Sequence, residues 1–149
     1  MPDRLLAEPP TPFVALHVAV ALAAAGDCRG LSRLRRYAER SDGPVFFGTV
    51  APLAEALIDL LHGDFELATN GLLALDVEGV EPLGGSAAQR EVVEDTLIYS
   101  AISAGRYELA LSVLERRLQR RESQHDRIRR RVLAHELMRS RQARADLSG

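Results

Sequence analysis

Two short stretches, GDFELA at Gly63–Ala68 and GRYELA at Gly105–Ala110, share one pattern that decides the fold. Gly26-Asp27-Cys28 is a shorter copy, and the three glycines lie 37 and 42 residues apart. Each glycine follows an apolar helical run and opens another, so it can end one helix and turn the chain sharply. The aromatic residue two positions later packs into the corner, and the alanine five positions later lets the two helices approach. Repeats at this period are typical of solenoids built from paired helices.

The first copy is degenerate, because Cys28 and Leu31 occupy its aromatic and alanine positions. The three copies together predict an all-α fold, a right-handed α-solenoid of tetratricopeptide-like helical hairpins. We expect hairpins over residues 12–41, 48–79 and 86–122, followed by a capping helix over 124–143. Residues 1–11 are then an N-terminal extension, 12–143 a single helical-repeat domain and 144–149 a C-terminal tail. The capping helix is amphipathic and is expected to turn one apolar side inward, with Ile128, Val132, Leu133 and Leu137 on it.

The stretch Gly84–Val92, GGSAAQREV, is interpreted as the start of a helix and not as a phosphate-binding loop. Ser86 and Gln89 have the spacing of a capping box, in which each side chain bonds to the backbone N–H of the other. The stretch lacks the glycine and lysine spacing of nucleotide-binding loops.

The motif GGS-x-AQR, with APLAEAL at residues 51–57 and Gly63-Asp64-Phe65, resembles the C-terminal half of the tetratricopeptide repeat protein 38 family. The resemblance covers roughly residues 12–122 and implies a helical-repeat fold more than a reaction. Family members are expected to carry a histidine after the serine, where this chain has Ala87. An activity that depended on that histidine would therefore be missing here.

Composition and charge set the broad class of protein. All 19 basic residues are arginine, which is typical of a GC-rich, bacterial genome. Residues 1–105 carry 7 arginines against 15 acidic residues and residues 106–149 carry 12 against 6, giving formal charges of −8 and +6. The single cysteine, Cys28, excludes an intramolecular disulfide. The apolar run 13–25 is too short to span a bilayer and follows a net acidic segment, which predicts a cytoplasmic protein without a signal peptide.

The first helices of successive hairpins line the concave face of a repeat solenoid, where partner segments commonly bind. In this chain those helices carry acidic, aromatic and aliphatic residues, namely Glu55, Asp59, Glu91, Glu94, Asp95, Ile98, Tyr99 and Ile102. We predict that they form an acidic groove for a basic, partly apolar peptide, which makes the chain a non-enzymatic interaction module. The alternative for Ile98 and Ile102 is that they pack against the neighbouring hairpin.

The first predicted helix is apolar nearly all round, as is normal for a helix that is covered on more than one side. We therefore expect a second subunit, in a homodimer, or another protein to cover a face that includes Phe13, Val14, Leu16 and Val20. His17 lies within the same run and is expected to be a core residue and not a metal ligand.

Motifs that carry chemistry are missing from the sequence. The four histidines form neither an HExxH motif nor an i, i+4 pair, and no GxSxG or cysteine–histidine signature occurs, so we expect no metal and no cofactor. The arginine-rich residues 116–131 alternate with acidic ones and lack stacking aromatics, so they are interpreted as solvated helix faces and not as a nucleic-acid site. The alternative function is an accessory protein that binds or transforms a small metabolite in a helical cleft near Tyr99.

Overall fold

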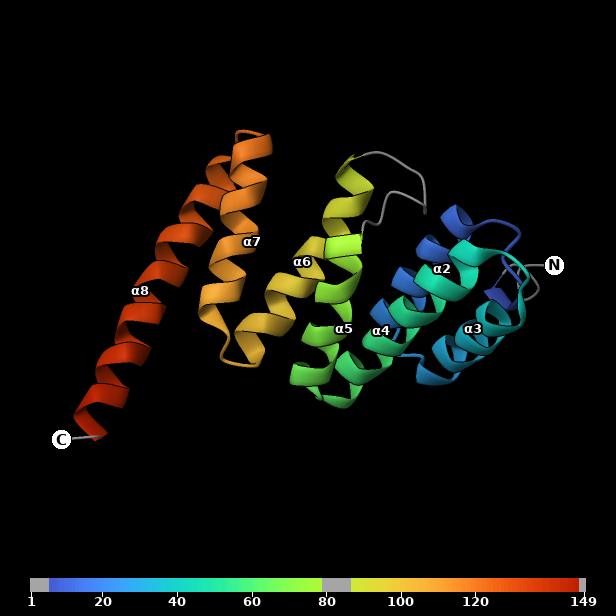
Figure 1. Cartoon of the computed structure of the whole chain (residues 1–149), viewed down its shortest axis with the longest axis horizontal. Helices are drawn as coiled ribbons and strands as arrows, with labels where there is room; N and C mark the ends of the chain where they lie inside the picture. The colour runs from blue at the N-terminus through green and yellow to red at the C-terminus, as the bar shows by residue number, and fades with distance from the viewer. Residues whose placement is uncertain (1–5, 79–86, 148–149) are drawn as a thin grey trace. The chain divides into compact units, whose positions relative to one another are not determined.

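Figure 1 shows the chain as a computed structural model, which describes the backbone of residues 6–78 and 87–147. Throughout these residues the chain consists of helices and short connections, without any strand, so the all-α prediction is confirmed. The helices are α2 (Pro12–Ala24), α3 (Cys28–Arg40), the π-helix η1 (Phe46–Val50), α4 (Ala51–His62), α5 (Phe65–Glu78), α6 (Ala87–Ser103), α7 (Tyr107–Arg120) and α8 (Gln124–Leu147). None of the described helices is long and apolar enough to cross a bilayer.

The chain forms two compact units, Met1–Leu97 and Ile98–Gly149, and the boundary between them lies inside α6. The predicted repeat domain over 12–143 therefore contains two units. The first holds α2 to α5 with the N-terminal part of α6, and the second holds the C-terminal part of α6 with α7 and α8.

Three glycines end helices in the same way. Among the described residues only Gly26, Gly63 and Gly105 have positive φ, at 67°, 81° and 73°. At the second turn Gly63 N–H donates to Leu60 O at 3.1 Å and Asp64 N–H donates to Asp59 O at 2.9 Å. The other two turns repeat this pair of bonds, which defines a Schellman motif and satisfies carbonyls at the helix end. The turn positions predicted from the glycine spacing are confirmed.

The positions that follow each turn are packed as the repeat pattern predicts. Leu31, Ala68 and Ala110, each five residues after its glycine, are fully buried. Phe65 and Tyr107, each two residues after its glycine, are half-buried. The three turns therefore share backbone geometry and a buried position, although the residue types differ.

Further glycines set the distance between neighbouring helices of the first unit. A Cβ at Gly71 in α5 would lie 3.1 Å from the Cβ of Ala56 in α4, so these two helices approach closely there. In the first hairpin, where leucine replaces alanine, a Cβ at Gly30 would lie 2.5 Å from Cδ2 of Leu22. The same Cβ would lie 2.5 Å from Oδ2 of Asp27, so Gly30 leaves room both for Leu22 and for the residue that caps α3.

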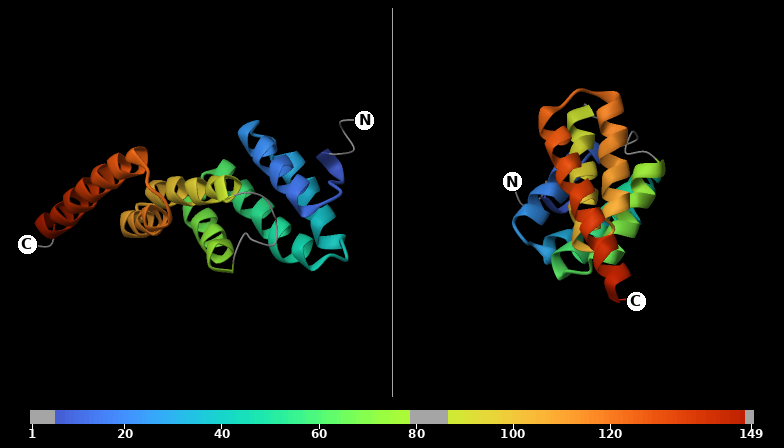
Figure 2. Two further views of the ribbon diagram at one scale, coloured as in Figure 1. Left: turned by 90° about the horizontal axis from the view of Figure 1, so that it is seen from above. Right: turned by 90° about the vertical axis from the view of Figure 1, so that its left-hand side faces the viewer.

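In the first unit α3 packs on α2 and on α4, and α4 packs on α5 (Figure 2). Pro12 opens α2 behind the Thr11 cap, and Pro52 lies in the first turn of α4, where a missing N–H is tolerated. Tyr37 of α3 contacts the segment before α2 and the start of η1. Its hydroxyl donates to Pro9 O at 3.2 Å, and its ring meets Phe46 edge-on at 5.7 Å.

In the second unit α7 packs on α8, which is longer and runs past the start of α7 (Figures 1 and 2). The helix α8 continues to Leu147, so most of the predicted tail is helical. The expected apolar side of α8 is wrong in part, because Leu133 is buried whereas Ile128 and Val132 are 53% and 56% exposed. Neighbouring residues lie about 100° apart around a helix, so Val132 and Leu133 cannot both face α7.

Candidate functional site

The residues of the predicted acidic groove lie on α4 and α6 and belong to both compact units. The first unit contains Glu55 and Asp59 on α4 with Glu91, Glu94 and Asp95 on α6, and the second contains Ile98, Tyr99 and Ile102. The groove as a whole stays a prediction. Its residues differ in their ion pairs and in their exposure to solvent.

On α4 the two groove acids have different electrostatic environments. Glu55 forms an ion pair with Arg35 of α3, whose Nε also lies 3.5 Å from Glu39 Oε1, and the bond to Glu55 raises the pKa of Arg35. The pKa of Asp59 is raised, first by burial and then by the negative charges of Glu55 and Asp64. The pKa of Asp59 therefore reflects its burial first and the neighbouring acids second.

On α6 only part of the predicted set faces solvent. Glu94 and Ile98 are buried, at 8% and 0% exposure, so Ile98 is a core residue. Asp95 and Tyr99 are exposed, whereas Glu91 and Ile102 are half-buried. A partner reaching this helix would therefore meet an acidic and aromatic surface that is narrower than the predicted one.

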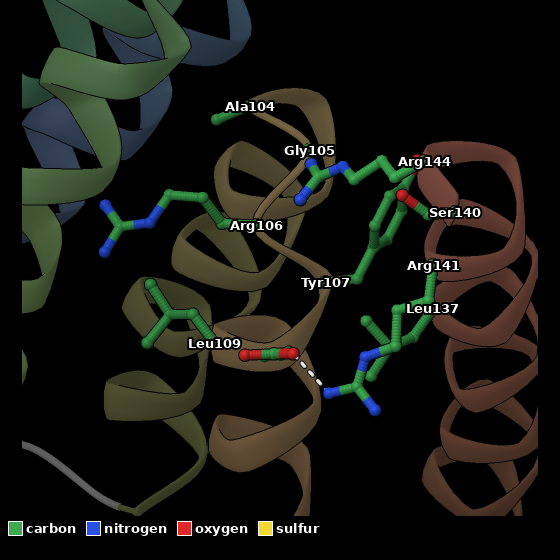
Figure 3. A pocket seen from close by; sticks show the side chains of 10 residues that line it. Ala104, Gly105, Arg106, Tyr107, Leu109, Leu137, Ser140, Arg141 and Arg144 are labelled. Carbon is green, nitrogen blue, oxygen red and sulfur yellow. Dashed lines mark hydrogen bonds and ion pairs between the residues drawn. The ribbon is translucent and has the colours of Figure 1, made fainter. Parts of the chain in front are cut away.

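A cleft of about 440 Å³ lies within the second unit, between the turn at Gly105, the start of α7 and the C-terminal half of α8 (Figure 3). The Tyr107 ring extends toward Ser140, and an ion pair joins Arg141 of α8 to Glu108 of α7. The Arg144 side chain extends toward Gly105, whereas Arg106 points away from the cleft (Figure 3). The cleft thus combines hydroxyl groups, an aromatic ring and more positive than negative charge.

No motif in the sequence predicts this cleft. Its polar wall comes from Glu108 and Arg141, which are 33 residues apart and belong to no shared pattern. The predicted metabolite pocket near Tyr99 is one helix earlier in the chain. The GRYELA repeat singles out Tyr107 as its aromatic position, and this residue lines the cleft.

The arginine-rich segment contains a buried ion cluster that its charge pattern did not reveal. Asp126 is 2% exposed, and its carboxylate oxygens lie 3.7 Å from Arg117 Nη1, 3.3 Å from Arg121 Nη2 and 3.6 Å from Arg129 Nη1. Arg117 is itself only 1% exposed. The interpretation of this segment as solvated faces is therefore wrong for Arg117, which holds the corner between α7 and α8.

The predicted partner face of α2 divides between core and surface. Leu16 is buried in the protein's own core, Val14 and Val20 are half-buried, and Phe13 is 39% exposed. The prediction of a core histidine is wrong, because His17 is exposed, with its ring 4.5 Å from that of Phe13. The exposed side of α2 is otherwise made of alanines, so its larger apolar side chains are mostly used internally.

Metal-ligating, thiol and capping residues are the remaining candidates. In the described part of the chain no three histidine, cysteine, aspartate or glutamate side chains gather in a way that could hold a metal ion. Cys28 is a half-buried free thiol. The helix α6 begins at Ala87, directly after Ser86, but the capping contact between Ser86 and Gln89 lies outside the described residues.

Comparison of the chain with protein-family models, with curated proteins and with solved structures finds no match.

Proposed function

We propose that this chain is a tetratricopeptide-like repeat module that binds a protein segment and catalyses no reaction. The observation that carries the proposal is the threefold recurrence of one turn, with a left-handed glycine and a fully buried residue five positions later. Stacked repeats of this kind leave the first helices of the hairpins in a row that can receive a peptide. The motif GGS-x-AQR supports a relation to the tetratricopeptide repeat protein 38 family.

The partner is a basic, partly apolar segment. Residues 41–97 carry one arginine against 11 acidic residues, a formal charge of −10. Asp59, with its raised pKa, and the exposed Asp95 offer carboxylates to such a segment. The exposed ring of Tyr99 offers an apolar and aromatic contact. Complementary charge favours encounter and selects against acidic partners.

The absence of lysine from the chain allows a direct test. A carbodiimide joins carboxylates to amines without a spacer, so internal cross-links of this chain can involve only its N-terminal amine. After affinity capture at about 0.15 M salt, where exposed charges are partly screened, we expect partner lysines to be joined to Glu91 or Asp95. The readout is mass spectrometry of the cross-linked peptides.

The test needs a variant that changes the groove and spares the core. Glu91→Ala/Asp95→Ala removes two acids while leaving the buried Glu94 in place. The matched control is Glu8→Ala/Asp42→Ala, which removes two exposed acids elsewhere. We expect the first variant to lose the captured protein and the control to retain it. Equal capture by both variants, or cross-links that avoid α4 and α6, would reject the groove.

A second candidate function has one observation in its favour, the cleft beside Tyr107. Arg141, Ser140 and the tyrosine hydroxyl could hold a small anionic metabolite in its volume of about 440 Å³. Native mass spectrometry of the protein from cells tests this function. A bound small molecule that is lost from Arg141→Ala would favour the second function over the first.

A further inference from the structure

The charge and the exposed apolar residues of α8 complement those of the predicted acidic groove. We propose that the segment received by the acidic groove is the outer face of α8 of a second copy, so that the chain associates head to tail. This inference rests on the proposed function, because it takes the same groove as the receiving surface. A second copy contains no lysine, so self-association is tested separately from the lysine cross-links to another protein.

The supplying surface is the outer face of α8, meaning the side opposite the buried Leu133. Ile128 and Val132 lie one turn apart there, 53% and 56% exposed. Arg131 and Arg139 lie on the same side and are also exposed. Over its whole length α8 carries seven arginines against three acidic residues, a formal charge of +4. It therefore has the character predicted for the ligand, a basic and partly apolar segment.

The receiving surface shows the same arrangement with the opposite charge. On α6 Val92 is 40% exposed, and in the sequence it lies between Glu91 and Asp95. This apolar side chain is thus accompanied by two carboxylates. In specific interfaces, apolar contacts at the centre contribute affinity, and complementary charges around them fix the orientation of the partners.

The distribution of charge between the units favours association in one direction. The unit Ile98–Gly149 carries 12 arginines against 6 acidic residues, a formal charge of +6, whereas the unit Met1–Leu97 carries 7 arginines against 15 acidic residues, a formal charge of −8. Like surfaces repel and unlike surfaces attract, so a symmetric contact through two α8 faces is disfavoured. A head-to-tail contact joins two different surfaces and can repeat from copy to copy.

Sedimentation velocity of the purified full chain tests the proposal at about 20 mM and about 500 mM salt, where the screening length changes several-fold. At low salt we expect the average mass to rise with concentration from 16.3 kDa toward twice that value or more. At high salt we expect the monomer. A protein that stays monomeric at low salt and high concentration would overturn the proposal.

Two variants locate the two surfaces. Ile128→Ser/Val132→Ser removes the apolar residues of α8 without changing charge, and Glu91→Arg/Asp95→Arg reverses the receiving surface. Each alone is expected to weaken association at low salt by about tenfold or more, as for the loss of interface anchors. An equimolar mixture is expected to form a one-to-one dimer, because one partner retains α8 and the other the groove. Failure of the mixture to associate would contradict a head-to-tail contact.

The matched controls distinguish this contact from a general effect of net charge and from a contact through α2. Glu8→Arg/Asp42→Arg changes the net charge as much as the groove variant does, at exposed acids outside the groove. Phe13→Ser alters the exposed residue of the predicted α2 face. Both are expected to associate like the wild type, and circular dichroism checks that every variant is folded. If Phe13→Ser loses association while the α8 and groove variants keep it, the contact lies on α2 and not on α8.

The outcome also separates this inference from the function on which it rests. If the chain is strictly monomeric and Asp95 still becomes cross-linked to the lysine of another protein, the proposed groove is retained and the proposed self-association is rejected. A chain that associates through α8 even when Glu91 and Asp95 are replaced has a different receiving surface, which rejects this inference, whereas the cross-links to another protein still decide the groove.

Discussion

Arg117 and Asp126 face each other in the interior of the second unit, with Arg117 Nη1 3.7 Å from Asp126 Oδ1 and each side chain 2% exposed. The aspartate also lies within ion-pair distance of Arg121 and Arg129, while the backbone N–H of Asp126 donates to the Ser123 hydroxyl at 3.1 Å. One carboxylate in the first turn of α8 thus gathers three arginines. Its negative charge also suits the N-terminal end of that helix.

This cluster predicts unequal effects for its two central members. Asp126→Ala removes the buried carboxylate that Arg117, Arg121 and Arg129 share and is expected to lower the free energy of unfolding by about 3–5 kcal/mol. Arg117→Met is expected to cost less, because Arg121 and Arg129 still neutralise Asp126. Urea unfolding measures both, and the double variant should cost less than the sum of the two. The control is Asp146→Ala at the exposed end of α8, and equal costs for Asp126→Ala and Arg117→Met would contradict the neutralising role of Arg121 and Arg129.

The turn at Gly63 predicts a purely conformational effect. Its φ of +81° disfavours any residue with a Cβ, although an added Cβ would meet no atom within 4 Å. Gly63→Ala is therefore expected to lower the free energy of unfolding by about 1–2 kcal/mol. Gly63→Asn should cost less, since asparagine tolerates this region better. Thermal unfolding provides the measurement.

Gly48 is the matched control for that variant. It is exposed, an added Cβ would also meet nothing within 4 Å, and its φ is not positive. Gly48→Ala is expected to be neutral or stabilising by up to about 1 kcal/mol. If both glycines responded alike to alanine, the left-handed turn would not be the cause.

The raised pKa of Asp59 predicts a pH-dependent effect. Because its pKa is higher in the folded than in the unfolded chain, ionisation of Asp59 weakens folding at neutral pH, and this penalty vanishes as the pH falls below the ordinary aspartate range, about 4. Asp59→Asn is thus expected to stabilise the protein slightly at pH 7, by about 0.5 kcal/mol or less. Unfolding measured at pH 7 and at about pH 3 should show the gain only at pH 7. The control Asp42→Asn, at an exposed acid, should show no such difference.

Local patterns in the sequence were sufficient to predict the helices and the turns between them. A left-handed residue after an apolar helical run nearly requires glycine, so Gly26, Gly63 and Gly105 marked the turns directly. The packing of α6 was harder to predict, because apolar residues lie on more than one side of it. Burial of Glu94 and Ile98 depends on which side meets a neighbouring helix, and periodicity alone leaves that open.

Interactions between distant residues could not be predicted from local patterns. Arg117 lies in a run of charges that looks solvated, and only the chain reversal after α7 brings it to Asp126. In the same way the cleft beside Tyr107 depends on how α8 packs on α7. The outward position of His17 was hidden because α2 is apolar on nearly every side.

The close approach of α4 and α5 at Gly71 and Ala56 predicts a steric effect with a specific rescue. A Cβ at Gly71 would lie 3.1 Å from the Cβ of Ala56, so a larger side chain must push the helices apart. Gly71→Leu is expected to lower the free energy of unfolding by about 1–3 kcal/mol. Gly71→Ala should be nearly neutral, because its better helix propensity, about 1 kcal/mol, offsets the tight contact.

The rescue removes the methyl group on the other side of the same contact. Ala56→Gly alone loses helix propensity and a buried methyl group. In this background Gly71→Ala is expected to become clearly stabilising, because the space that the Ala56 methyl group occupied is empty. The difference between the effect of Gly71→Ala in the two backgrounds is the coupling energy of the contact. Chemical unfolding of the four proteins measures that coupling. A coupling near zero would mean that the two helices do not approach at these residues, and α4 and α5 would then have to pack through other side chains.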